Sequence, residues 1–168
     1  MRSTVLGLAA GGRSSLGVAV PVLAATRGRR GVGPALLRGS VRLAVLGELV
    51  GDKMPGIPSR TDAPVLGARV ASGALGGLGL ALTEGRSAGK AVLASMAGAA
   101  GAWAGSYAGT EWRRWAAEEG PEWLQPDLRA ALVEDAVVLA TAARLVERTP
   151  PRAVRNTPRH TRRSSQRR

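Results

Sequence analysis

Charged side chains interrupt the long apolar stretches of this chain, and they are the residues best suited to chemistry. A charge in an apolar medium costs at least a few kcal/mol, so it is usually kept where it pairs with an opposite charge or lines water. The candidate cluster consists of Arg13, Glu48, Asp52, Lys53, Arg69, Glu134 and Asp135. Its cations and anions nearly cancel, which predicts either a buried salt-bridge cluster or a polar cavity for an ion, proton or small polar solute.

Other site chemistries fit the sequence poorly. The single histidine, His160, lies near the C-terminus and there is no cysteine, so a His-based triad, a thiolate metal site and a disulfide framework are not expected. The run from Gly85 to Lys90 is too short for a phosphate-binding loop, and Ala91 follows where Ser or Thr is needed. Neighbouring arginines compete for the candidate carboxylates, which disfavours a hard cation. The sequence therefore favours a protein with no enzymatic activity, cofactor or metal.

Five apolar stretches hold these charges. Each has about 20 residues, the length that crosses the apolar core of a bilayer. The stretches are 4–26, 34–51, 63–83, 88–109 and 127–146. The chain has 23 Gly and no Phe among its 168 residues, and small residues suit helices that pack closely in lipid. We therefore predict an all-α, polytopic transmembrane bundle of about five helices over residues 1–147. A less favoured interpretation treats the first stretch, which Arg13 interrupts, as a signal peptide.

The charges between the stretches predict an orientation. Basic residues follow the first, third and fifth stretches, whereas the connection at 110–126 is acidic. The positive-inside rule then places the N-terminus outside and the C-terminus in the cytoplasm of a bacterial plasma membrane. All five aromatic residues lie between Trp103 and Trp123, which predicts an interfacial belt on the outer side, with a short interfacial helix at 112–119.

Residues 148–168 form a second segment of different composition. They include eight arginines, several prolines and no apolar run, which is typical of a disordered tail. We expect the tail to set the topology and to bind anionic lipid headgroups. Nucleic acid is a less favoured partner because binding would be non-specific and no aromatic platform accompanies the charge.

Small residues recur every four positions in several stretches. Gly7 and Gly11 form one such stripe, Gly73 and Gly77 a second, and Gly101 and Gly105 part of a third. Positions four apart share a helix face, where small residues let helices approach closely. We favour packing within one bundle over a face for a homo-oligomer.

The sequence resembles a bacterial membrane-protein family catalogued as domain of unknown function 4126. The resemblance covers roughly residues 5–147 and rests on the following positions: Gly12-Arg13-Ser14, Glu48, Asp52-Lys53, Pro55, Gly67, Arg69 and Glu134-Asp135. It implies a multi-helix membrane protein and carries no activity with it.

Two function hypotheses follow. The first is a small transport-like or solute-binding bundle that uses the charge cluster in the outer half of the membrane. The alternative is a non-catalytic structural or assembly protein in which the cluster is a buried salt-bridge lock. A soluble, arginine-rich nucleic-acid binder is a weaker third hypothesis.

Overall fold

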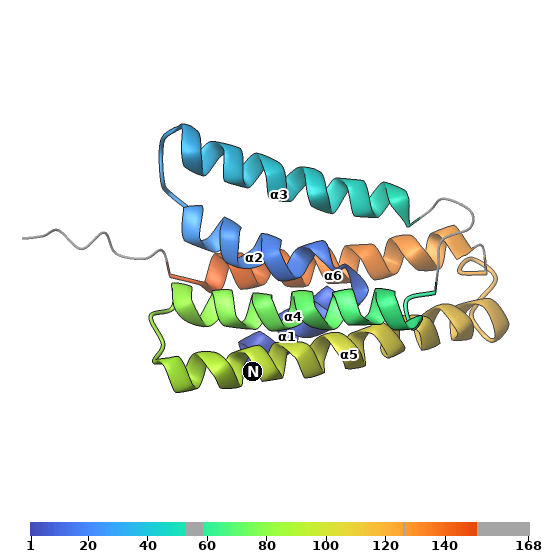
Figure 1. Ribbon diagram of the computed structural model, residues 1–168. Coiled ribbons are helices and arrows are strands. Elements are labelled where there is room, and N and C mark those ends of the chain that lie inside the picture. Colours follow the sequence, from blue (N-terminus) through green and yellow to red (C-terminus); the bar gives the residue numbers. More distant parts are fainter. Residues whose placement is uncertain (53–58, 126, 151–168) are drawn as a thin grey trace, which may run out of the picture.

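The computed structural model describes residues 1–52, 59–125 and 127–150, which form six α-helices and no strand (Figure 1). The helices are α1 (Arg2–Gly12), α2 (Ser15–Thr26), α3 (Val32–Gly51), α4 (Ala63–Thr83), α5 (Ala88–Glu118) and α6 (Asp127–Arg148). The predicted all-α class is therefore confirmed for this part of the chain. Lys53 and most of the predicted tail lie outside the described residues.

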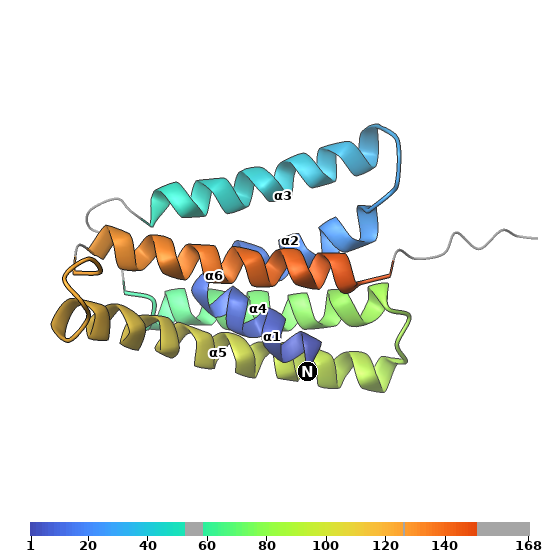
Figure 2. The same cartoon turned by 180° about the vertical axis from the view of Figure 1, so that it is seen from behind.

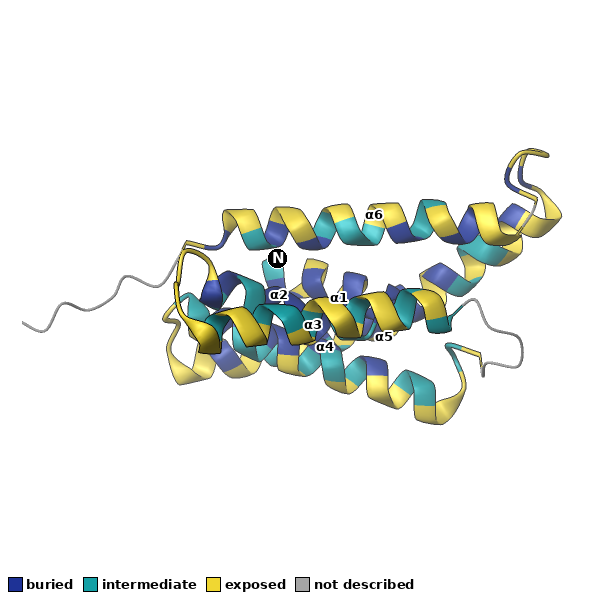
Figure 3. Ribbon diagram, turned by 90° about the horizontal axis from the view of Figure 1, so that it is seen from above, coloured by how far each residue is buried: buried dark blue, intermediate teal, exposed yellow. Residues whose placement is uncertain are grey.

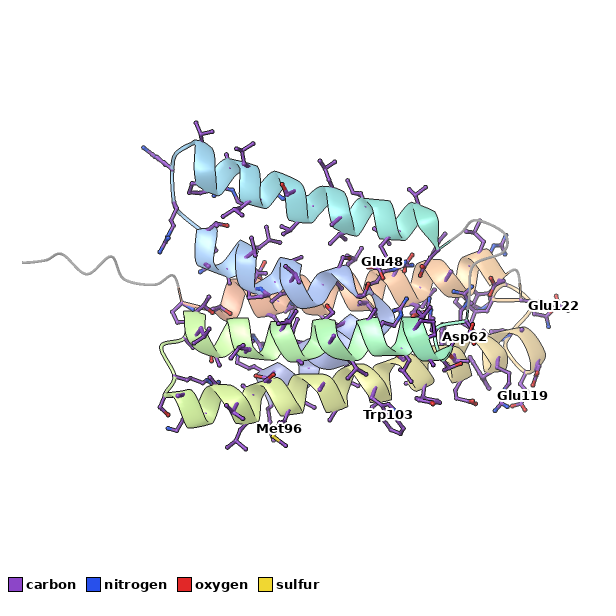
Figure 4. The ribbon with its side chains drawn as sticks, in the orientation of Figure 1. Glu48, Asp62, Met96, Trp103, Glu119 and Glu122 are labelled. Carbon is purple, nitrogen blue, oxygen red and sulfur yellow. The ribbon has the colours of Figure 1, made fainter. Side chains whose placement is uncertain are left out.

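The four long helices, α3 to α6, lie lengthwise and alternate in direction (Figures 1 and 2). One end of the bundle carries the connections at Arg27 and Arg86 and the C-terminus of α6; we call it the basic end. The other carries Asp62, Glu119 and Glu122, and we call it the acidic end (Figure 4).

The first apolar stretch is a helical hairpin, so the prediction of one continuous helix over 4–26 is wrong. Arg2 at the start of α1 pairs with Glu84 at the basic end, at 2.5 Å. The chain then runs into the bundle to Arg13, where the backbone is extended, and returns along α2. Arg27 reaches the basic end again, where it donates to the backbone oxygen of Glu147 at 2.7 Å. At 1.5 Å per residue each arm is about 16–18 Å long, too short to cross an apolar bilayer core of about 30 Å.

The hairpin brings both ends of the described chain together. Arg2 Nη2 donates to the hydroxyl of Thr149 at 2.7 Å and to the backbone oxygen of Leu145 at 3.2 Å. The N-terminus and the C-terminal end of the described residues therefore lie at the same end of the bundle, whereas one continuous helix over 4–26 would place the N-terminus at the opposite end. The difference arises because α2 returns to the end at which α1 begins.

The small-residue stripes face one another inside the bundle. A Cβ at Gly7 or Gly11 would overlap the backbone of α5, and one at Gly98 would overlap the backbone of α4 at Gly73. A Cβ at Gly76 would likewise overlap α2 at Gly17. The stripes therefore serve helix contacts within this chain, as the favoured interpretation expected.

The aromatic residues lie towards the acidic end of α5 and beyond it. α5 is one helix of 31 residues, so the separate interfacial helix expected at 112–119 does not form. Trp103 and Tyr107 are half-exposed and their rings lie 4.9 Å apart, while Trp112 donates to the backbone oxygen of Ala130 at 3.1 Å. In Figure 4 Trp103 projects outward from the bundle.

Several charged side chains are buried with the apolar core, and many apolar side chains are exposed. Arg13, Arg69 and Asp135 are buried, whereas α3 has no buried residue and exposes leucines along its length (Figure 3). By length and composition, α4 alone among the described helices is long and apolar enough to cross a membrane, with mean hydropathy 1.5. Such a helix is also found in the cores of soluble proteins. Charges in α3 and α6, and the break between α1 and α2, keep those segments below the same limits.

Candidate functional site

The charge cluster surrounds the break between α1 and α2. Helix ends leave backbone groups without partners: carbonyl oxygens where α1 stops and N–H groups where α2 starts. Such groups inside a bundle need hydrogen-bond partners, because an unpaired buried backbone group costs free energy. The predicted site residues supply them.

Arg69 of α4 satisfies the end of α1. Its Nη1 donates to the backbone oxygens of Gly11 and Gly12, each at 2.7 Å. A guanidinium at a helix C-terminus also complements the negative end of the helix dipole. Ser106 of α5 adds a longer hydrogen bond to the oxygen of Gly11, at 3.3 Å.

Glu48 of α3 satisfies the start of α2. Its carboxylate accepts from the backbone nitrogens of Ser14 at 2.7 Å and Ser15 at 2.8 Å, and from the Ser14 hydroxyl at 2.9 Å. A carboxylate at a helix N-terminus complements the positive end of the dipole. In Figure 4 Glu48 lies near the acidic end of α3, the helix that packs chiefly against α2. The two halves of the hairpin are thus capped by opposite charges from two different helices.

Arg13 is the central cation, and its side chain is only 1% exposed. Its Nε donates to Asp135 of α6 at 2.9 Å, and its Nη1 donates to Asp52 at 2.7 Å and to the backbone oxygen of Glu48 at 3.1 Å. Asp135 also accepts a second bond, from Arg13 Nη2. One side chain therefore ties the hairpin tip to both α3 and α6.

Two further arginines join the cluster, and the sequence did not single them out. Arg60 pairs with Glu134 and lies 3.7 Å from Asp52. Arg113 of α5 lies 3.8 Å from Glu134 and binds Asp127 through Nε at 2.7 Å. Arg60 lies in the predicted loop and Arg113 beyond the predicted fourth stretch, so neither was expected to face an apolar segment.

Six of the seven predicted site residues are therefore brought together, and Lys53 lies outside the described residues. With Arg60, Arg113 and the Asp127 that binds Arg113, the described cluster has four cations and five anions: Arg13, Arg60, Arg69 and Arg113 against Glu48, Asp52, Asp127, Glu134 and Asp135. Removing one partner of a buried ion pair typically costs about 3–5 kcal/mol, because the other charge is left uncompensated. Each cation of the cluster therefore has at least one carboxylate partner within the protein.

One oxygen in the cluster lacks a hydrogen bond. Glu134 Oε2 is buried and accepts none, although Oε1 of the same carboxylate binds Arg60. Glu134 also lines an otherwise apolar pocket of about 330 Å³ between α1, α5 and α6. Among the described residues, no group of three or more Asp, Glu or His side chains is placed to hold a metal ion. The arrangement is suited to fixing helices and, at Glu134, to accepting one more donor.

Comparisons with known proteins do not assign the chain to a family. No family model, no curated protein and no solved structure matches the chain. The resemblance drawn from the sequence stays a prediction.

Proposed function

We propose that this chain is a non-catalytic integral membrane protein in which the charge cluster is a buried salt-bridge lock. The observation that carries the proposal is the near-complete burial of Arg13 between Asp52 and Asp135. In this role the lock fixes the α1–α2 hairpin against α3, α4 and α6, so that a broken helix is stable inside the bundle. Irregular backbone at membrane depth is tolerated where protein surrounds it and satisfies its polar groups.

The outward-facing side chains support a lipid environment. α3 is the most peripheral helix of the bundle, and yet most of the side chains that it exposes are apolar. Val32 is 76% exposed and Leu43 is 70% exposed. Further exposed apolar side chains lie on several helices: Leu36, Leu37, Leu46, Leu75, Val92, Leu93, Met96, Leu132 and Val137. Such an amount of exposed apolar side chain on several helices supports contact with a membrane or a protein partner.

The hydropathy of most helices is lowered by residues that need not face lipid. Glu48 and Asp135 turn inward to the cluster, and the buried glycines lie at helix contacts. A charge that faces the bundle interior and is paired is the usual way for such residues to occur in membrane helices. Helices that carry such inward-facing charges and glycines can therefore lie in a membrane even though their mean hydropathy is low.

The proposed topology places the N-terminus and the C-terminal end in the cytoplasm. The basic end carries Arg27, Arg29, Arg30, Arg86 and Arg148, and positive charge favours the cytoplasmic side. The acidic end with its half-exposed Trp and Tyr side chains then faces outward, which retains the expected side of the aromatic belt.

Membrane fractionation combined with cysteine labelling tests this proposal, since the chain has no native cysteine. We expect the full-length protein to resist carbonate extraction. In spheroplasts an impermeant thiol reagent should label Ser59→Cys at the acidic end, and should label Gly28→Cys or Arg30→Cys at the basic end only after permeabilisation. Release of the protein by carbonate would refute the membrane assignment.

A solute-binding, transport-like role is the second candidate. The buried Glu134 Oε2 without a hydrogen bond favours it, because a ligand donor in the adjoining pocket would complete that carboxylate. This candidate requires water to reach the cluster, whereas the lock requires the cluster to be dry.

A further inference from the structure

Two adjoining cavities open near the basic end, between α2, α3 and α6. The first, of about 490 Å³, is an apolar slot lined by residues that include Val20, Val45 and Leu139. The second, of about 520 Å³, is lined by Arg27, Arg29, Arg30, Arg38 and Arg42. Leu23, Arg42 and Val146 line both, so the apolar slot continues into the basic cavity.

The slot exists because α3 packs loosely. α3 contacts α2 but buries none of its residues, so the space between α3 and α6 is not filled by side chains. Its lining is almost entirely aliphatic; its polar side chains are those of Arg42 and Glu147. An apolar space of this size is within the range of ligand cavities, and an acyl chain matches its chemistry.

The arginines of the basic cavity divide into two groups. Arg27 donates to the backbone oxygens of Val146 and Glu147 at the end of α6, and Arg38 donates to those of Thr26 and Arg29. These two hold the loop and the helix ends in place. Gly28 and Gly31, with φ of +73° and +116°, allow the turn between them.

The other group is left without protein partners. The guanidinium groups of Arg29, Arg30 and Arg42 make no hydrogen bond or ion pair within the described residues, and no acidic side chain lines this cavity. Arg42 lies farther along α3, from where its long side chain can extend along apolar surface to the cavity. Guanidinium groups bind phosphate oxygens in bidentate geometry.

We propose that the slot and the basic cavity together bind one anionic glycerophospholipid, with an acyl chain between α3 and α6 and the phosphate against Arg29, Arg30 and Arg42. The inference rests on the proposed membrane location. It concerns the body of the bundle, and is separate from lipid binding by the C-terminal tail. The single slot with a cationic mouth selects an anionic lipid over a zwitterionic one of equal chain length.

Native mass spectrometry of the purified full-length protein tests the site, with phosphatidylglycerol as the probe and phosphatidylcholine of the same acyl chains as its comparison. We expect preferential retention of phosphatidylglycerol. Because each basic residue contributes about 1 kcal/mol, Arg30→Gln with Arg42→Gln should weaken that retention by on the order of tenfold or more. The matched control, Arg144→Gln with Arg148→Gln, removes the same charge from exposed positions of α6 and should leave retention nearly unchanged.

A steric variant separates a built site from diffuse attraction. Ala143 is exposed and lines the slot, so Ala143→Trp should obstruct the acyl chain without altering charge, while Ala140→Trp on the same helix should not. Equal loss in both charge-pair variants, or no effect of Ala143→Trp, would overturn the proposal. A dimer that Ala143→Trp abolishes would identify a second copy as the occupant and would also overturn it. If the protein resists carbonate extraction yet shows no lipid preference, only this inference fails; if carbonate releases it, the proposed membrane location fails as well.

Discussion

Arg13 and Asp135 lie 122 positions apart in the sequence, yet Arg13 Nε donates to Asp135 Oδ1 at 2.9 Å in the interior of the bundle. The pair joins the tip of the α1–α2 hairpin to the middle of α6. Because both side chains are buried, neither charge can be solvated if the other is removed.

Arg13→Gln or Asp135→Asn should each destabilise the protein by about 3–5 kcal/mol, the usual cost of leaving a buried charge unpaired. Unfolding of the purified protein in detergent measures the change. The double variant should lose less than the sum of the single variants, since the two groups interact directly. Arg144→Gln on the exposed face of α6 is the control; equal losses in Arg13→Gln and Arg144→Gln would contradict a buried pair.

Glu48→Gln should destabilise by about 1–3 kcal/mol, because an amide offers one oxygen where the carboxylate offers two, and one helix N–H at the start of α2 is left unsatisfied. Glu48→Ala, which removes both oxygens, should cost more. Glu118→Gln, at an exposed position of α5, provides the comparison. If Glu48→Gln unfolds like Glu118→Gln, the cap on α2 makes no net contribution.

Gly98→Ala should lower the unfolding temperature, because its Cβ would overlap the backbone of Gly73 and force α4 and α5 apart. Gly47→Ala, in α3, meets no atom within 4 Å and should be neutral or slightly stabilising, since Ala is the better helix former. The same thermal unfolding assay compares the two. The reverse order would mean that α4 and α5 do not approach each other at Gly98.

A cysteine pair tests the hairpin itself. The Arg2 guanidinium reaches the Thr149 hydroxyl in the structure, so Arg2→Cys with Thr149→Cys should be joined by a flexible bifunctional thiol cross-linker that spans the length of an arginine side chain. Arg2→Cys with Asp62→Cys should not, because Asp62 lies at the opposite end of the bundle (Figure 4). Peptide mapping identifies the product. A cross-link between positions 2 and 62, in place of one between positions 2 and 149, would mean that residues 4–26 form a single helix.

The sequence was sufficient to identify most of the charged residues of the cluster, but it did not predict which of them pair with one another. Arg13, Glu48, Arg69 and Asp135 could be identified because each lies in an apolar stretch, where a charge requires compensation. Their partners depend on which helices are neighbours and in which register, and Arg60 was missed because its charge was assigned to a solvated loop. Spacing alone does not encode such contacts.

The hairpin had a local signal that hydropathy concealed. Gly12 followed by Arg13 and two serines is a combination that ends one helix and begins another, and Ser14 does occupy the position before α2. Summing hydropathy over 4–26 merged two short arms into one apparent crossing. The error then misplaced the expected position of the N-terminus, because a hairpin returns the chain to the end of the bundle at which it started, whereas a single helix does not.

Solvent access at the hairpin tip is the most direct test of the buried lock. Ser14 is half-buried and binds Glu48, so Ser14→Cys reports on the cluster without removing a charge. We would measure its rate of modification by an impermeant thiol reagent in spheroplasts, relative to Ser59→Cys at the exposed acidic end. We expect Ser14→Cys to remain unmodified until the protein is unfolded. Modification of the folded, inserted protein at a rate comparable to Ser59→Cys would contradict the lock and would support a water-filled cavity for a solute.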